Sequence, residues 1–306
     1  MALHLKKAII RNSVFNSVAC AALAAIFIPL LGAPGGMLWP ALLIGGVGVL
    51  TFLRTAYKIR QDLLSRVQEL ASYVHVDRDS AQARKQVDWS TIDDYATQLA
   101  TRGFRPLGDF TTYPSAPTLA GVAAMFTDAD GSMIIEIQQL KLMPQPGKGV
   151  PNDGIYFSIM SMVGGSIRVV TSNHKPMALT YMMRGEHDVA TARPGCGLME
   201  LLATHTDLLT RLRERVGKAP STGLTVERYV LAIREAQAQA RTRLSAMSGY
   251  AIACAVDRFD ADRLLRWTPQ IADLKEVPQR RLEELDNAFG SDVQPPIFHE
   301  SLATQF

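Results

Sequence analysis

The sequence predicts an α+β protein in which an N-terminal transmembrane helical hairpin precedes a cytoplasmic domain with an antiparallel β-meander flanked by helices. Three observations lead to this fold class. The stretch from Asn12 to Leu53 holds 42 residues without Asp, Glu, Lys or Arg. Residues from about 104 to 172 alternate in the manner of strands and contain tight-turn signals. Residues from about 196 to 290 return to helical spacing.

The uncharged stretch is too long for one membrane span. As a helix its 42 residues would reach roughly 63 Å, about twice the thickness of a ~30 Å hydrocarbon core. The segment Gly32-Ala33-Pro34-Gly35-Gly36 interrupts it. We therefore expect a hairpin domain over residues 1–60, with spans at about 13–31 and 37–53. A cleaved signal peptide is the competing interpretation, and the immediate second apolar segment argues against it.

Small residues recur on one side of each predicted span. Such faces allow two helices to approach closely within lipid. The alternative is that Ala and Gly are simply common in membrane spans. The predicted packing residues are Ser17, Ala21 and Ala25 in the first span and Ala41, Gly45 and Gly48 in the second.

Basic residues flank the hairpin at both ends. They are Lys6, Lys7 and Arg11 before it and Arg54, Lys58 and Arg60 after it. The positive-inside rule then predicts inner-membrane localisation with both termini cytoplasmic and the lipid bilayer as a partner. The chain carries +3, so removing these six charges leaves 3 − 6 = −3 for residues 61–306. This balance argues against nucleic acid as a partner, and three sparse cysteines are compatible with a reducing compartment.

The remaining chain divides into two predicted segments. Residues 61–89 are expected to form a juxtamembrane helix and a polar connector, because apolar residues recur from Ile59 to Val74 at helical spacing. Residues 90–306 form the predicted cytoplasmic α+β domain. Its first helix is expected to begin at Ser90, with Asp93 completing a capping box, and to end at Gly103.

Five strands are predicted next, and short connections make neighbouring strands antiparallel. The turn signals are Asp128-Ala129-Asp130-Gly131 and Gly164-Gly165. The predicted strands cover residues 104–113, 122–126, 133–142, 155–163 and 166–172. Helices are predicted over 198–216 and 226 to about 256, with shorter ones near 261–267 and 278–289.

Several short motifs fall between Ser90 and Val216. They are Gly103-Phe104, Leu107-Gly108-Asp109-Phe110, Thr171-Ser172-Asn173, and the helix from Leu201 to Leu209 that contains His205. On these motifs the chain resembles a loose group of uncharacterised bacterial membrane-anchored proteins. The resemblance implies that this region is one coherent domain, and it implies no activity.

Common catalytic and cofactor motifs are missing from the sequence. It contains no P-loop, no dinucleotide fingerprint and no nucleophile elbow, and the spacing of its six histidines predicts no metal site. Cys196 follows Pro194-Gly195 at a predicted helix start, where a thiolate is stabilised. His174 or His187 would then be its base. The alternative is that Cys196 is a small structural residue.

These patterns favour a membrane-anchored protein-binding or scaffolding domain without a cofactor or identified chemistry. The expected partner is another protein, whose identity the sequence does not give. A membrane-tethered thiol hydrolase that uses Cys196 is the first alternative. A subunit of an oligomeric membrane assembly, with the chain as a homo-oligomer, is the second.

Overall fold

A computed structural model describes residues 9–19, 21, 38–66, 72–80, 83–84, 87–113, 119–142, 154–174, 185 and 188–261. The chain divides into two compact units. One unit comprises residues 1–68, 177–183 and 240–266, and the other comprises residues 69–176, 184–239 and 267–306. We call them the helical unit and the sheet unit and describe each by itself.

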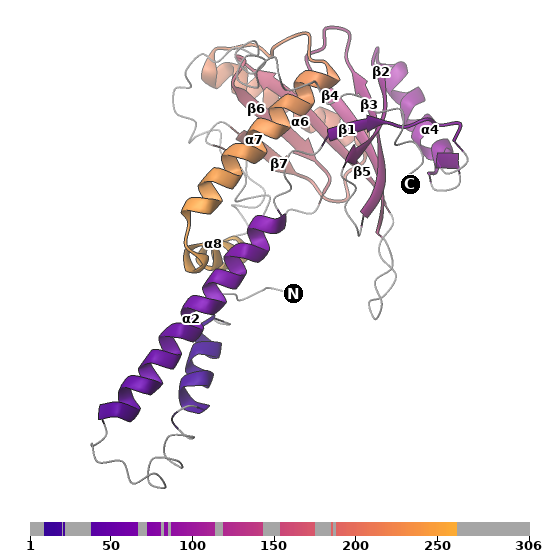
Figure 1. Cartoon of the computed structure of the whole chain (residues 1–306). Helices are drawn as coiled ribbons and strands as arrows, with labels where there is room; N and C mark the ends of the chain where they lie inside the picture. Colours follow the sequence, from indigo (N-terminus) through magenta and orange to yellow (C-terminus); the bar gives the residue numbers. More distant parts are fainter. Residues whose placement is uncertain are drawn as a thin grey trace, which may run out of the picture. The chain divides into compact units, whose positions relative to one another are not determined.

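The sheet unit is built on a seven-stranded sheet whose strands follow one another in chain order (Figure 1). All neighbouring strands are antiparallel except β6 and β7, which are parallel. The five predicted strands are confirmed as β2 to β6. The strands are β1 (Ser72–His75), β2 (Arg105–Tyr113), β3 (Leu119–Thr127), β4 (Ile134–Leu142), β5 (Gly154–Val163), β6 (Ile167–Ser172) and β7 (Asp188–Ala192).

Two strands extend this meander at its ends, so the predicted antiparallel sheet is corrected to a mixed one. β1 lies where the sequence predicted a continuing helix, and it pairs with β2 from Ser72 opposite Tyr113 to His75 opposite Phe110. β7 pairs in parallel with β6. A parallel partner requires a longer connection than a hairpin, so no local turn signal marked it.

Helices cover both faces of the sheet. Side chains alternate between the faces along each strand, so adjacent residues enter different cores. On one face α4 (Trp89–Ala100) and α6 (Leu198–Val216) bury a core with Ile92, Leu99, Leu201, Ile135, Ile137 and Ile159. On the other face the first part of α7 (Val226–Ala246) buries a core with Tyr229, Val230, Phe110, Met125, Ile134 and Met160.

The helix boundaries confirm some predictions and correct others. α6 has the predicted limits. The cap of α4 is Asp88 instead of Ser90, because an Asp88 carboxylate oxygen accepts a hydrogen bond from the Thr91 backbone N–H at 3.2 Å. The helix predicted from 226 to about 256 is two helices, α7 and α8 (Gly249–Ala261). Met247 and Ser248 separate them, and the Ser248 hydroxyl accepts from the Ala251 N–H at 3.1 Å.

The helical unit contains a helical segment at residues 9–19, α2 (Leu38–Arg66) and α8. The first segment and α2 lie close together at Gly48, where a Cβ atom would collide with the Ser17 hydroxyl. The Ser13 hydroxyl also donates to the Gly48 carbonyl at 3.3 Å. α2 packs on α8, where the rings of Phe52 and Tyr250 have centroids 5.4 Å apart.

The predicted transmembrane hairpin is wrong. Within the described residues, no helix has both the length and the apolar content required to cross a bilayer. α2 continues past the uncharged stretch to Arg66 and includes Arg54, Lys58 and Asp62. The predicted inner-membrane localisation with both termini cytoplasmic is corrected by the same finding. The fold class is therefore α+β with a seven-stranded mixed sheet.

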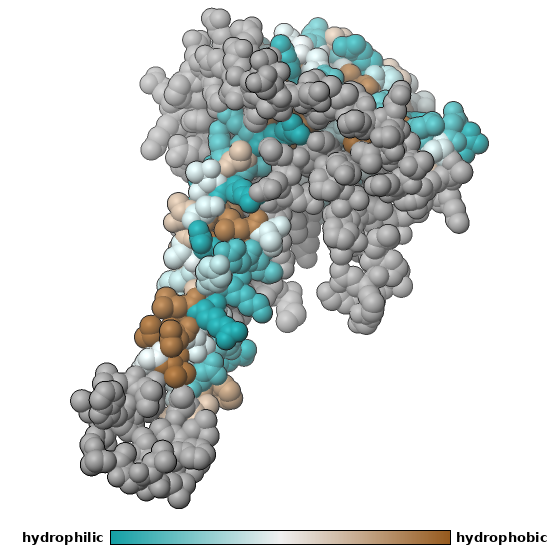
Figure 2. Space-filling model, in the orientation of Figure 1, coloured by the Kyte–Doolittle hydropathy of each residue, from teal (hydrophilic) through white to brown (hydrophobic). Residues whose placement is uncertain are grey.

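Large apolar side chains are exposed on the helical unit. Figure 2 shows brown, apolar surface alternating with teal, hydrophilic surface along these helices. The exposed large apolar residues are Ile10, Val14, Phe15, Val18, Val49, Leu50, Leu53 and Tyr57. Of the predicted small packing residues, Ser17 and Gly48 meet, whereas nothing lies within 4 Å of a Cβ built on Gly45. Ala25 and the side chain of Ala41 lie outside the described part, and Ala21 is half-buried.

Candidate functional site

A β-bulge in β2 determines the direction of the side chain of Asp109 at the candidate site. The pairing of β2 with β3 shifts between Pro106 and Gly108, which leaves Leu107 as the extra residue. Gly108 has φ +138°, and a Cβ there would lie 3.0 Å from His75 Nε2. Glycine is therefore required at this bulge. After the bulge Phe110 enters the α7 core, and Asp109 is directed to the face that α4 covers.

Asp109 holds the guanidinium of Arg78 in a two-point ion pair. The Arg78 Nε donates to Asp109 Oδ2 at 2.5 Å and the Nη2 to Oδ1 at 3.1 Å. Nη1 donates to Asp93 Oδ1 of α4 at 2.6 Å. The guanidinium carbon also lies 4.5 Å from the centroid of the Trp89 ring. The hydrogen bond with Asp109, followed by that with Asp93, raises the pKa of Arg78 further above its ordinary value.

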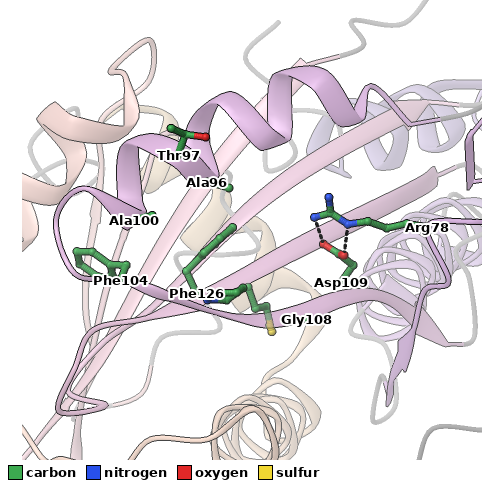
Figure 3. A pocket seen from close by; sticks show the side chains of 10 residues that line it. Arg78, Ala96, Thr97, Ala100, Phe104, Gly108, Asp109 and Phe126 are labelled. Carbon is green, nitrogen blue, oxygen red and sulfur yellow. Dashed lines mark hydrogen bonds and ion pairs between the residues drawn. The ribbon is translucent and has the colours of Figure 1, made fainter.

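This ion pair borders a pocket of about 330 Å³ between α4 and strands β2 and β3. Figure 3 shows the Phe104 and Phe126 rings near α4 and the ion pair of Arg78 and Asp109 away from them. The pocket is lined by Arg78, Ala96, Thr97, Ala100, Phe104, Pro106, Gly108, Asp109, Met125 and Phe126. A concave apolar surface with a few fixed polar groups is the usual composition of a binding pocket.

The charges at this border are unequal. Arg78 contributes one positive charge, and Asp93 and Asp109 contribute two negative charges. The side chain of Asp93 is 57% exposed and that of Arg78 is 39% exposed, whereas that of Asp109 is 12% exposed. An arriving group therefore meets Arg78 at the pocket edge and apolar side chains inside it, with Asp93 behind Arg78 as its exposed hydrogen-bond partner.

The sequence-predicted residues Cys196 and His174 lie in the sheet unit. Cys196 is half-buried beside Gly197, the N-cap of α6, and its side chain is hydrogen-bonded with Arg193. The Nε2 of His174 is 3.0 Å from Gln138 Oε1. The structure thus supplies His174 with a partner other than the Cys196 thiol, and burial lowers the pKa of His174. His187 lies outside the described residues.

A buried hydrogen-bonded cluster around Glu136 was not predicted from the sequence. Glu136 is 2% exposed, and its carboxylate accepts from the Tyr73 hydroxyl at 3.0 Å and from Gln138 Nε2 at 2.6 Å. Tyr229 is a third hydrogen-bond partner. Burial raises the pKa of Glu136. The signal was an acidic residue between Ile135 and Ile137, in the apolar first part of β4.

His205 is also fully buried, with a relative exposure of 0%. Its Nε2 lies 3.0 Å from the Ser161 hydroxyl and its Nδ1 2.9 Å from the Thr171 hydroxyl. Burial lowers the pKa of His205 to about 3. The enclosure of both ring nitrogens by buried hydroxyls makes this a structural link between α6 and strands β5 and β6.

Comparisons of the chain with protein-family models, with curated proteins and with solved structures give no match. The resemblance noted for residues 90–216 therefore stays an expectation. The fold and the pocket define the sheet unit as an α+β domain whose described residues include an apolar pocket bordered by an ion pair.

Proposed function

We propose that the sheet unit is a protein-binding domain whose pocket under α4 receives an apolar side chain of the partner. The observation that carries this proposal is the combination of apolar walls with the fixed ion pair of Arg78 and Asp109 at the border. A volume of about 330 Å³ is near the lower end of the range for ligand sites, about 300–1,000 Å³. Such a pocket suits one side chain better than a large cofactor.

The ion pair can also contact the partner backbone. A guanidinium has five N–H donors, and the contacts of Arg78 with Asp109 and Asp93 engage one donor on each nitrogen. The second donors of Nη1 and Nη2 can bind carbonyl oxygens of an incoming segment. Because Asp109 and Trp89 fix the guanidinium in advance, little side-chain entropy is lost when the segment binds.

The charge at the border favours a particular kind of segment. Two carboxylates and one guanidinium leave a local charge of −1, and Asp93 is the more exposed carboxylate. A Lys or Arg next to the apolar anchor would therefore be attracted, whereas an acidic neighbour would be repelled. The expected partner segment carries an apolar residue beside a basic one.

A pocket-filling variant tests this function. Ala100 is an exposed residue of α4 that lines the pocket, so Ala100→Trp places a ring over the opening. We expect acetyl-leucyl-lysinamide to shift the NMR signals of Ala96 and Phe126 in the full chain. The α-amide of acetyl-leucyl-glutamic acid, which keeps its side-chain carboxylate, should bind several-fold more weakly. In Ala100→Trp the shifts disappear.

Ala203→Trp on the exposed face of α6 is the matched control, since it adds the same ring to an exposed helical alanine. It should bind the lysine probe like the native chain. Unchanged binding in Ala100→Trp, or shifts that avoid the pocket residues, would contradict the proposed function.

A further inference from the structure

A second concave surface lies in the helical unit. Residues 9–19 and α2 are joined by the bond from the Ser13 hydroxyl to the Gly48 carbonyl and by a bond from the Asn16 amide to the Thr51 hydroxyl at 3.4 Å. Beside these contacts a groove of about 400 Å³ opens between the two helices. It is lined by Asn12, Phe15, Asn16, Thr51, Arg54, Thr55 and Lys58.

The charges in this groove have one sign. Arg54 and Lys58 are four residues apart on α2, so their side chains are neighbours on one helical face. Like charges at this spacing destabilise an isolated helix by about 0.2–0.5 kcal/mol. The lining contains no carboxylate, and the ion pairs of the described residues include neither cation. An anion in the groove would remove this repulsion.

The other lining groups specify the kind of anion. Two asparagine amides and two threonine hydroxyls stand beside the two cations and can all donate hydrogen bonds. A carboxylate has two oxygens, whereas a phosphate monoester offers three terminal oxygens in a tetrahedral arrangement. Arginine and lysine are the usual phosphate-binding side chains. Phe15, which is 70% exposed, supplies an apolar surface for the rest of the ester.

We propose that the groove between residues 9–19 and α2 binds a phosphate ester, with Arg54 and Lys58 as the charged ligands. Asn12, Asn16, Thr51 and Thr55 supply hydrogen bonds to the phosphate oxygens. The site is separate from the pocket under α4, and neither proposal depends on the other. The phosphate group can belong to a free metabolite or to a lipid headgroup, and the experiment separates these sources.

The test is calorimetric titration of the full chain with glycerol 3-phosphate. We expect saturable binding that Arg54→Gln and Lys58→Gln each weaken about tenfold, the size of one lost charge-assisted contact. Arg11→Gln is the matched control, because it removes an exposed charge from the neighbouring helix outside the groove lining. It should weaken binding less than twofold. Glycerate, which carries a carboxylate instead, should bind at least fivefold more weakly.

A second arm presents the same monoester group on phosphatidic acid vesicles, with phosphatidylcholine vesicles for comparison. Binding of glycerol 3-phosphate in solution identifies a free ester, and groove-dependent binding confined to phosphatidic acid identifies a headgroup. Circular dichroism verifies that each variant is folded. Equal losses in Arg54→Gln and Arg11→Gln, equal affinity for glycerate, or no saturable binding in either arm would overturn the proposal.

Discussion

Lowering the pH from 7.5 to 4.5 should reduce the free energy of unfolding by about 3 kcal/mol through His205 alone. The pKa of His205 is about 3 in the folded chain and near the ordinary 6.5 when it is unfolded. Above pH 6.5 the ring is neutral in both states. Below pH 6.5 the imidazole of His205 binds a proton in the unfolded chain but not in the folded chain, so stability is lost progressively until about pH 3. The part of the interval below pH 6.5 covers about two pH units, each worth about 1.4 kcal/mol.

The variant His205→Gln isolates this effect. A glutamine amide can still bridge the hydroxyls of Ser161 and Thr171, but it does not titrate. Urea unfolding of both proteins at the two pH values gives the difference, and all other titrating groups cancel. We expect the pH dependence of the variant to be smaller by about 3 kcal/mol. Equal pH dependence would show that His205 is not buried as described.

Replacing Glu136 by leucine should destabilise the chain by about 3 kcal/mol at neutral pH. The hydroxyls of Tyr73 and Tyr229 and the amide of Gln138 would lose their shared acceptor. Each buried polar group without a partner costs about 1–3 kcal/mol. Relief of the cost of burying a carboxylate offsets part of the sum.

Glu136→Gln is the control, because it keeps an acceptor for the tyrosines and lacks the charge. Urea unfolding should rank the native chain and the glutamine variant well above the leucine variant. Because the pKa of Glu136 is raised in the folded chain, the folded chain binds this proton more tightly than the unfolded chain, whose pKa is about 4.5. The difference stabilises the fold below pH 4.5, and this stabilisation is lost as the pH rises. The deficit of the leucine variant should therefore be larger at pH 5 than at pH 8. A leucine variant as stable as the glutamine variant would contradict this account.

Local sequence patterns predicted the parts of the fold that local interactions determine. The five predicted strands correspond to β2 to β6, and turns at Asp128–Gly131 and Gly164-Gly165 join β3 to β4 and β5 to β6. α6 carries a regular apolar face that runs from Leu198 to Leu212. In these elements the period and the flanking turn residues are sufficient.

Elements that depend on distant partners were not predictable in this way. β1 is four residues long and forms a strand because β2 lies beside it. The ion pair of Arg78 and Asp109 joins residues 31 positions apart, and the segment of Arg78 looked like a polar connector. Leu107-Gly108-Asp109 was noted as a motif, but the bulge that directs Asp109 depends on the register with β3. The pocket could therefore not be predicted from spacing.

The uncharged stretch predicted two membrane spans, and for the described residues that prediction is wrong. Its second span, predicted at 37–53, corresponds to the start of α2, which begins at Leu38 and continues into the charged segment as far as Arg66. The small-residue pattern still marked one real contact, between Ser17 and Gly48. Close helix packing at this contact could therefore be predicted from the sequence.

Photo-crosslinking from the pocket edge tests the proposed protein-binding role most directly. Thr97 lines the pocket and Thr210 lies on α6; both are exposed, and both hydroxyls donate to the carbonyl four residues earlier. A photoreactive amino acid at either position in the full chain therefore replaces an equivalent threonine. We predict a defined crosslinked protein from position 97 that Ala100→Trp abolishes, and no such product from position 210. The same pattern from both positions, or no crosslinked protein from position 97, would contradict the proposal.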